Sequence, residues 1–501
     1  MLIKLNDIDD LWQRFIVRAI PDLRRRPMTT PDRHFLETLW RALDGAPDAP
    51  ARVAFTGAGD LPSVFPVSDL AVAAVAVAGL ALSELLGAEP GKAPAVTADR
   101  RLASFWFGWS LRPRGWDLPS PWDAVAGDYA AADGWIRLHT NAPHHRAAAL
   151  SVLGVAAERA AVARAVAGWR AGELEAAVVA AGGCAAEMRG ADAWAAHPQG
   201  RAVATTPLLT LDGVGEAAGQ GAVPDWPLDP ARPLAGIRVL DLTRVLAGPV
   251  ATRFLAGYGA QVLRIDPPDW DEPALVAEVT PGKRCARLNL RQATDRAVFE
   301  RLLAQADVLV HGYRPDALAR LGLDAARRRS LNPGLVDICL DAYGWDGPWA
   351  GRRGFDSLVQ MSCGIAEAGM RLLGRDRPTP LPVQALDHAT GYILAAMALR
   401  GLALRRRTGQ GVQGRTALAA TARLLMAGGA RATDAPPPAA DAGRLGAGAG
   451  AHRLGTRPPP GPTRGGRGGA AGLGPAGGTA GRRRRPMGLM FAIAIANYSY
   501  L

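Results

Sequence analysis

The stretch that decides the fold of this chain is IRVLDLTRVLAGP, residues 237–249. Its mostly apolar first half is typical of a buried strand, and the Gly-Pro pair marks a turn into a helix. A second stretch, LDHATG at residues 386–391, puts one carboxylate at the start of an apolar helix. Together they suggest a parallel sheet that holds a nucleotide-type cofactor, with an aspartate placed to react with whatever the cofactor carries.

Strand and helix patterns alternate after this stretch. We expect helices at 250–258, 294–305 and 315–321, and strands at 237–242, 261–266, 307–310 and 335–340. Such alternation indicates βαβ units, whose right-handed connections produce a mostly parallel sheet. The predicted fold class is therefore α/β: a parallel Rossmann-like sheet with helices on both faces, plus a smaller α+β domain.

The 501 residues are enough for two or three domains. We expect a helical N-terminal region at 1–123, a small α+β domain at 124–204, a Pro/Gly-rich linker at 205–232, a nucleotide-binding domain at 233–426 and a tail at 427–501. The N-terminal region carries a faint repeat, because GLAL at 79–82 recurs at 401–404 with the same spacing to a later glycine. This offset of 322 puts Phe65 opposite Asp387. The region is either a degenerate partial copy or a chance match between Ala-rich helices.

The basic charge of the chain is concentrated in the tail. The formal charge is +12, but residues 427–486 hold ten Arg and two Asp, which leaves +4 for the rest. A nucleic-acid partner is therefore not expected. Residues 427–488 contain no Lys, Glu, Val, Ile, Phe, Tyr or Trp, so they cannot bury much apolar surface. The tail is either a disordered basic segment or a GC-rich gene read out of frame beyond about residue 427.

The remaining bulk features favour a cytoplasmic protein. Its four cysteines are scattered without a C-x-x-C pair, which argues against disulfides or a metal site. Residues 1–10 are charged and lack the apolar core of a signal peptide. The Ala-rich run 70–86 is short for a membrane span and includes Glu84, so we expect a buried helix there and no membrane partner.

Six short motifs follow one another along the chain: GIRVLD at 236–241, AGP at 247–249, GAQV at 259–262, GKR at 282–284, YRPDAL at 313–318 and TGQG at 408–411. With these motifs, residues 233–425 resemble the class III CoA-transferases, which include formyl-CoA and carnitine-type CoA-transferases and the related 2-methylacyl-CoA racemases. DGWI at 133–136 and HPQG at 197–200 resemble the smaller domain of that family. In the family this domain follows the nucleotide-binding half, whereas here it precedes it, so the domain order looks rearranged.

The resemblance implies that Asp387 is the catalytic residue. In the family an aspartate before the helix that leads to the Thr-Gly-Gln-Gly turn attacks an acyl-CoA thioester, forms a mixed anhydride, and then carries CoA as an aspartyl thioester. We expect this carboxylate to be ionised near neutral pH and shielded from water. The alternative is structural, because an aspartate before a helix is a common N-cap.

The resemblance also implies where coenzyme A binds and how the chain assembles. By position, its adenine and phosphate contacts would fall on Leu288, Arg291, Gly312, Tyr313, Arg320 and Arg353. Tyr313 would stack on the adenine and the arginines would pair with phosphates. Pro267 and Leu246 depart from the formyl-CoA transferase pattern, which has Arg and Gln there. The partners expected are acyl-CoA, a carboxylic acid and, as in the family, a second copy in a homodimer.

Three alternative functions remain open. A 2-methylacyl-CoA racemase would need the histidine that the family's racemases carry at the position of Phe355, so transfer is favoured over racemisation. A nicotinamide dehydrogenase is suggested by Asp266 at a strand end, but the first turn lacks G-x-G-x-x-G. The third is an inactive CoA-binding pseudoenzyme, which the altered domain order and the tail both suggest.

Overall fold

The computed structural model describes residues 30–87, 93–110, 117–214, 226, 228–314, 316–430 and 491–493. Its centre is a seven-stranded sheet in the spatial order β6 (Leu209–Val214), β12 (Gly411–Ala417), β11 (Val336–Asp341), β10 (Val308–His311), β7 (Arg238–Leu242), β8 (Gln261–Asp266) and β9 (Lys283–Arg287). The strands from β12 to β9 are parallel, and β6 pairs with β12 in the antiparallel direction.

The order of the six parallel strands is that of a doubly wound dinucleotide-binding sheet. Numbered along the chain from β7 to β12, they lie in the order 3-2-1-4-5-6. The chain therefore changes direction between β7 and β10, where Val308 lies opposite Val239. In such a sheet ligands bind in the crevice outside the carboxyl ends of the strands at this switch point. The predicted α/β fold class is confirmed.

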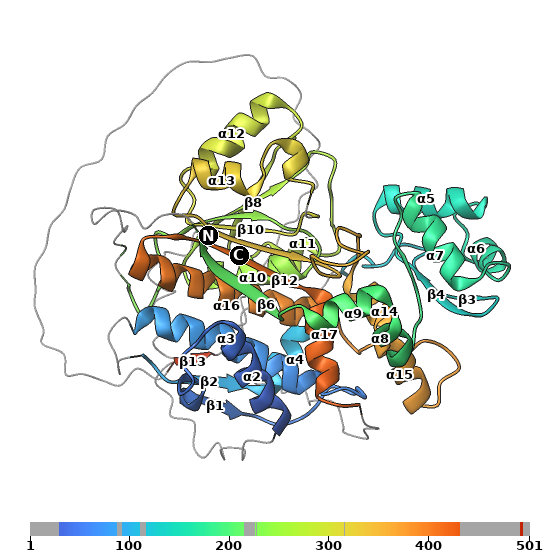
Figure 1. The fold of residues 1–501 in the computed structure, drawn as a ribbon, viewed down its shortest axis with the longest axis horizontal. Coiled ribbons are helices and arrows are strands. Elements are labelled where there is room, and N and C mark those ends of the chain that lie inside the picture. The colour runs from blue at the N-terminus through green and yellow to red at the C-terminus, as the bar shows by residue number, and fades with distance from the viewer. Residues whose placement is uncertain are drawn as a thin grey trace, which may run out of the picture.

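Helices cover both faces of the sheet (Figure 1). One face carries α12 (Ala293–Leu303) and α13 (Ala325–Leu331), and the other carries α10 (Ala247–Gly257) and α16 (Ala385–Thr408). Side chains on β7 alternate accordingly, because Leu240 packs with Phe299 of α12 whereas Val239 packs in the core that contains α10 and α16. The shorter elements are α11 (Val276–Val279), η2 (Ala319–Leu321), α14 (Asp356–Ser362), α15 (Ile365–Leu372) and α17 (Leu418–Ala427).

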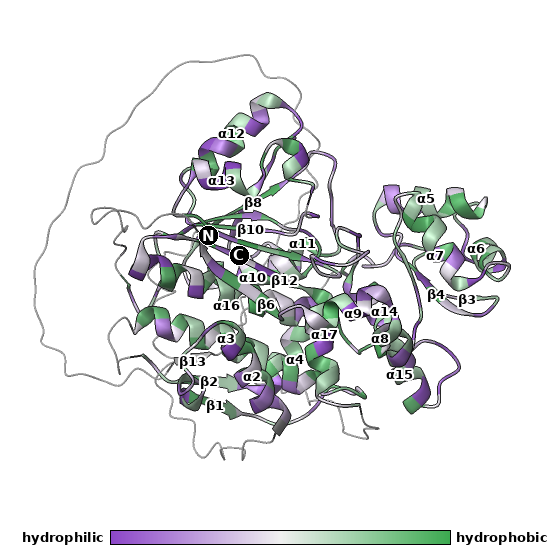
Figure 2. Ribbon diagram, in the orientation of Figure 1, coloured by the Kyte–Doolittle hydropathy of each residue, from purple (hydrophilic) through white to green (hydrophobic). Residues whose placement is uncertain are grey.

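The N-terminal region forms a layer beside α16. It contains α2 (Thr30–Ala42), η1 (Ala49–Arg52), β1 (Val53–Thr56), α3 (Val67–Leu86), β2 (Val96–Asp99) and α4 (Arg100–Phe107), and β1 and β2 are parallel. Figure 1 shows α3 lying next to α16, and both helices are largely apolar in Figure 2. By length and composition α3 could cross a membrane, but its side chains are buried in the core, which confirms the buried helix expected there.

The small domain projects from the side of the sheet (Figure 1). Its antiparallel sheet consists of β3 (Gly127–Ala131), β4 (Gly134–Leu138) and β5 (Ala185–Glu187), packed by α5 (Pro143–Leu153), α6 (Arg159–Val166) and α7 (Ala171–Ala180). Tyr129, Ile136 and Leu174 lie in its separate core. Helices α8 (Ala191–Ala196) and α9 (Pro198–Thr205) lead back to β6.

Several elements differ from the sequence-based expectations. Residues 209–214, placed in the linker, form the edge strand β6. In place of a helix at 315–321 the structure has η2, followed by α13. The expected helices within residues 1–29 and most of the tail fall outside the described residues, but 491–493 form β13 (Phe491–Ile493), paired with β2.

Candidate active site

Asp387 lies in the first turn of α16, on the face of the sheet that this helix covers. The N-cap residue is Gln384, whose side chain makes no capping hydrogen bond. Asp387 is the third helical residue and is only 7% exposed. No described residue donates a hydrogen bond to its carboxyl group, which is unusual for a buried polar side chain.

The carboxylate that caps α16 belongs to Asp356, at the start of α14. Its Oδ2 accepts hydrogen bonds from the backbone N–H of Leu386 at 2.9 Å and of Asp387 at 3.0 Å. Its Oδ1 accepts a further bond from the side-chain amide of Gln360. The alternative that Asp387 serves as the cap is therefore wrong, and Asp387 is free of that structural task.

The two carboxyl groups affect each other's ionisation. Burial, with the charge of Asp356 added, raises the pKa of Asp387 well above the ordinary value. Burial raises the pKa of Asp356 to about 6, against the hydrogen bonds that it accepts. The expectation that Asp387 is ionised at neutral pH is not supported, because Asp356 takes the helix N–H groups that would have stabilised its charge.

The surroundings of Asp387 are apolar and closely packed. The ring of His388 stacks on Phe107 of α4 with 5.3 Å between centroids, and burial lowers the pKa of His388 to about 3. One turn after Asp387, a Cβ on Gly391 would lie 2.5 Å from the carbonyl oxygen of Ala247. Only glycine therefore allows α16 to approach the start of α10 this closely.

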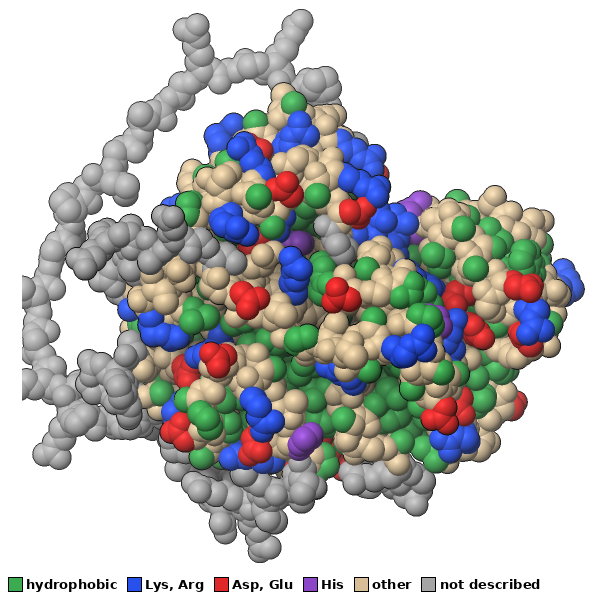
Figure 3. Space-filling view, viewed as in Figure 1, with side chains coloured by type: hydrophobic (Ala, Val, Ile, Leu, Met, Phe, Trp, Pro, Cys, Tyr) green, Lys and Arg blue, Asp and Glu red, His purple; other side chains and the backbone are tan. Residues whose placement is uncertain are grey.

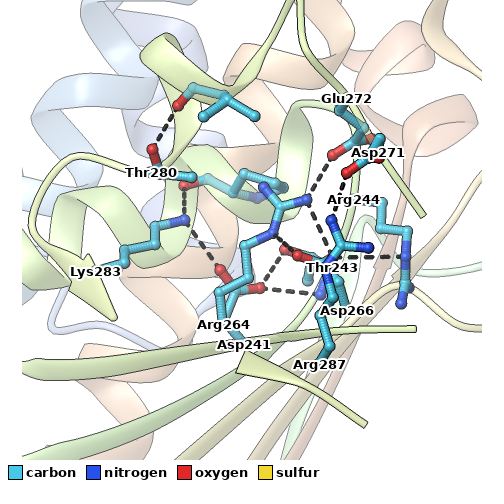
Figure 4. Close-up of polar contacts among 12 residues, drawn as sticks. Asp241, Thr243, Arg244, Arg264, Asp266, Asp271, Glu272, Thr280, Lys283 and Arg287 are labelled. Carbon is cyan, nitrogen blue, oxygen red and sulfur yellow. Dashed lines mark hydrogen bonds and ion pairs between the residues drawn. The ribbon is translucent and has the colours of Figure 1, made fainter. Parts of the chain in front are cut away.

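The turn between β7 and α10 is fixed by a buried ion pair, drawn in Figure 4. Lys283 Nζ lies 2.9 Å from Asp241 Oδ2, and both side chains are fully buried. Asp241 also accepts hydrogen bonds from the Thr243 backbone at 2.9 Å and from the Thr252 hydroxyl at 2.6 Å. Attraction and hydrogen bonds keep Asp241 ionised despite burial, and its pKa is lowered. The GKR motif thus has a structural role through Lys283.

The same turn contains a strained residue. Val245 has φ of 65°, a conformation that a β-branched residue rarely adopts. Its N–H donates to Glu272 Oε1 at 2.7 Å, and Glu272 in turn binds Arg264 of β8 at 2.5 Å. Strained backbone that is held by a network in this way clusters at ligand sites.

Arg244, next to this strained residue, lies at the switch point of the sheet. Its guanidinium carbon is 5.3 Å from the ring centre of Tyr313, which follows β10, and 5.4 Å from that of Trp270. Its Nη2 donates to the Tyr313 hydroxyl at 3.3 Å. The sequence interpretation missed Arg244, although its position directly after β7 was a usable signal.

The residues predicted to contact CoA lie in two separate parts of the structure. Leu288, Arg291, Gly312, Tyr313 and Arg320 lie in or near the loops after β9 and β10, at the carboxyl edge of the sheet. Figure 3 shows Lys and Arg side chains gathered over the lobe of α12 and α13 beside this edge. Arg320 is exposed and paired with Asp316. Arg353 instead lies at the junction with the small domain, where Nη1 donates to the Gly182 carbonyl oxygen at 3.1 Å.

Phe355, in the position of the racemase histidine, lies at the same junction. Its ring stacks on His139 of the small domain with 3.8 Å between centroids. Burial lowers the pKa of His139 to about 3, so this ring is neutral. Within the described part of the chain, no three His, Cys, Asp or Glu side chains are grouped to hold a metal ion.

Part of the chain is similar to one family of known proteins. The sequence model of CoA-transferase family III matches residues 234–452, which extends past the change of composition at residue 427. A probable fatty acyl-CoA transferase of Mycobacterium tuberculosis is 34% identical over 198 residues, 36% of this chain and 49% of the relative. The succinyl-CoA:glutarate CoA-transferase of Mus musculus is 31% identical over 218 residues, 40% of this chain and 49% of the relative.

The likeness covers only part of each protein. A crystal structure of the M. tuberculosis protein is 34% identical to the chain, with 40% of this chain and 58% of that one covered, at a TM-score of 0.35. Among these curated relatives, the chain spans about half of the relative's length.

Proposed function

Because the model of CoA-transferase family III matches residues 234–452, we propose that this chain moves CoA between an acyl-CoA and a carboxylic acid through Asp387. The observation that carries the proposal is the state of Asp387: a buried carboxyl group with no hydrogen-bond donor among the described residues, released from capping by Asp356. A buried carboxyl that has no structural partner is costly, and such costs are typical of reactive groups.

The reaction that we propose has balanced acyl and CoA steps. The Asp387 carboxylate attacks the thioester carbonyl of the donor, the C–S bond breaks, and CoA leaves as a thiolate while a mixed anhydride forms. The thiolate attacks the aspartyl carbonyl and expels the donor acid, which leaves an aspartyl-CoA thioester. The acceptor carboxylate then attacks this thioester, the C–S bond breaks, and CoA leaves again as a thiolate while a second mixed anhydride forms between Asp387 and the acceptor. The thiolate attacks the acceptor's acyl carbon in this anhydride, which gives the product acyl-CoA and releases the Asp387 carboxylate.

The raised pKa of Asp387 makes the first step of the cycle depend on the loss of a proton from this carboxyl group. Asp387 must lose its proton before it attacks, and the raised pKa makes the ionised form scarce but strongly nucleophilic. The apolar surroundings, including the stacked rings of Phe107 and His388, keep water from the anhydride and the thioester. Asp356 holds the first turn of α16 in place throughout.

The switch point of the sheet offers the chemistry that a nucleotide needs. Tyr313 supplies a ring face for the adenine, and Arg244, held between Tyr313 and Trp270, supplies a guanidinium for a phosphate. Arg320 is exposed but paired with Asp316, so it would contribute less to binding a second phosphate. Leu288, Arg291 and Gly312 line the same edge, and Arg353 would meet CoA only where it runs toward the small domain.

The test compares the buried carboxyl group of Asp387 with the partly buried one of Asp341. The protein is incubated with a panel of acyl-CoAs, and intact mass is recorded for wild type, Asp387→Asn and Asp341→Asn. Asp341 is a suitable control because burial also raises its pKa, to about 7, but it ends β11 and accepts a bond from Gly344. We expect a CoA adduct and acyl transfer in wild type and Asp341→Asn, and neither in Asp387→Asn. Transfer by Asp387→Asn at the wild-type rate would refute the mechanism.

A second candidate is a CoA-binding protein without turnover. It is favoured by the raised pKa of Asp387, which lowers the ionised fraction of this carboxyl group. The same mass experiment separates the two functions, because a pseudoenzyme binds CoA in calorimetric titration but never forms the adduct.

Racemisation is less favoured, because Phe355, at the position of the racemase histidine, cannot carry a proton. Exchange of the α-proton of 2-methylacyl-CoA with deuterated water, without CoA transfer, would favour that activity instead.

A further inference from the structure

Residues 53–107 and 336–427 contain two units with the same order of elements. In the first, the parallel strands β1 and β2 are connected through α3, and α4 follows β2 directly. In the second, the parallel strands β11 and β12 are connected through a longer segment that ends in α16, and α17 follows β12 directly. The long helices α3 and α16 both end at the glycine that the 322-residue offset equates, Gly87 and Gly409.

A matching hydrogen bond supports this correspondence independently of the sequence repeat. In the first unit, the Ser104 hydroxyl of α4 donates to the Ser68 hydroxyl of α3 at 2.8 Å. In the second, the Thr390 hydroxyl of α16 and the Thr421 hydroxyl of α17 are 2.7 Å apart. Ser68 and Thr390 differ by 322 positions, the offset of the sequence repeat. The two units share a topology, and each has a buried pair of hydroxyl groups between its long helix and the helix that follows. A chance match between Ala-rich helices would not produce both features.

The two units differ at the position of the reactive carboxylate. The offset equates Asp387 with Phe65, whose side chain is buried. The nearest acid in the first unit is Asp69, one turn later and also buried, but its Oδ1 binds Arg100 Nη1 at 2.8 Å. Arg100 also pairs with Asp60. Asp69 therefore has a cationic partner in Arg100, whereas no described residue pairs with the carboxyl group of Asp387.

The first unit nevertheless contributes to the site of the second. Phe107, the last residue of α4, stacks on His388 and lies parallel to the ring of Tyr392, with 6.2 Å between the centroids of Phe107 and Tyr392. Beside it, the ring of Trp106 lies 4.4 Å from the guanidinium carbon of Arg253 on α10. Since α3 packs along α16, the same contact that joins the units brings Phe107 next to the residue after Asp387.

We propose that residues 53–107 are an internal copy that has lost its own reactive carboxylate and now forms, through Phe107, a wall of the Asp387 site. Each chain then has one reactive carboxylate. A ring at this wall excludes water, which protects an anhydride at Asp387 and helps to keep Asp387 protonated. This inference deepens the proposed function and rests on it for the anhydride.

The first experiment counts reactive sites. Intact mass of the full chain after incubation with acyl-CoA should show one CoA adduct per chain, and peptide mapping should place it on Asp387. An adduct on Asp69, or two adducts per chain, would contradict the proposal that residues 53–107 have lost their reactive carboxylate.

The second experiment replaces Phe107 with leucine, and uses Phe299→Leu as a control because Phe299 is equally buried but lies on α12. We expect Phe107→Leu to raise the ratio of acyl-CoA hydrolysis to acyl transfer several-fold, and Phe299→Leu to leave it unchanged. An unchanged ratio in Phe107→Leu contradicts the proposal.

A measurement that needs no turnover separates the role of Phe107 from the proposed CoA-transferase function. Infrared titration of the Asp387 carboxyl, identified by subtracting the spectrum of Asp387→Asn, should give a lower pKa in Phe107→Leu than in wild type. If wild type forms no adduct, the proposed function fails, and this titration still decides whether Phe107 walls the site. An unchanged Asp387 pKa would then overturn the inference.

Discussion

Replacing Asp356 with asparagine should lower the pKa of Asp387. The change removes a negative charge whose Oδ2 lies 3.0 Å from the Asp387 backbone nitrogen, and it keeps an oxygen that can accept bonds from α16. A charge within about 4–6 Å moves the pKa of a carboxyl group by roughly 1–3. A change of that size corresponds to about 1.4–4 kcal/mol of differential stabilisation of the ionised form. The elevation of the pKa that burial causes remains.

The assay is the pH dependence of CoA-adduct formation, followed by quenched intact mass. Because the ionised carboxylate is the nucleophile, the rate should rise with pH through the Asp387 pKa, and this rise should move to lower pH in Asp356→Asn. On the acidic side, lowering the pKa by one makes the ionised fraction about tenfold larger. Asp341→Asn removes another carboxyl group, partly buried and with a raised pKa, and should leave the profile in place. A profile of Asp356→Asn that coincides with wild type would refute the reasoning.

Three further predictions concern stability and binding. The folded state raises the pKa of Asp387, so wild type loses stability as pH rises from about 4 through that pKa. Asp387→Asn should therefore melt at a higher temperature than wild type at pH 7 and at the same temperature below about pH 4. Lys283→Met leaves the Asp241 charge buried without its partner and should cost about 3–5 kcal/mol in urea unfolding, whereas a loss below about 1 kcal/mol would contradict a structural role. In calorimetric titration with CoA, Arg244→Ala should lose about 1.5–3 kcal/mol of affinity, but Arg320→Ala, exposed and already paired, about 1 kcal/mol or less. Equal losses would place the phosphates elsewhere.

The sequence predicted the buried strands well and the edge strands poorly. The strand expected at 307–310 matches β10, because a strand buried on both faces carries a run of apolar residues, here Val308, Leu309 and Val310. Lys283–Arg287, the edge strand β9, reads KRCAR and has no apolar signal, so it was not predicted. β6 was assigned to a linker because it pairs with β12, which comes far later in the sequence.

Only part of the candidate site could be proposed from the sequence. A carboxylate at the start of an apolar helix drew attention to Asp387, but its catalytic role was inferred from the resemblance to the class III CoA-transferases, because an aspartate at a helix start is by itself more typical of a cap. Its partner Asp356 belongs to another helix and meets α16 only through tertiary packing, so no local pattern indicated that it would take over the cap. For the same reason the raised pKa of Asp387 was not foreseen, since it follows from burial beside a distant acid.

The antiparallel edge strand also sets the timing of assembly during synthesis. β6 leaves the ribosome before any other strand of the central sheet, but its partner β12 is made last, with Val214 opposite Gly411. Until then β6 exposes unpaired backbone groups on both edges, a state that favours pairing with other chains. Closing so long a loop also slows folding. We therefore expect a nascent chain arrested before residue 411 to depend on a chaperone for its solubility, and the dependence to end once β12 has emerged.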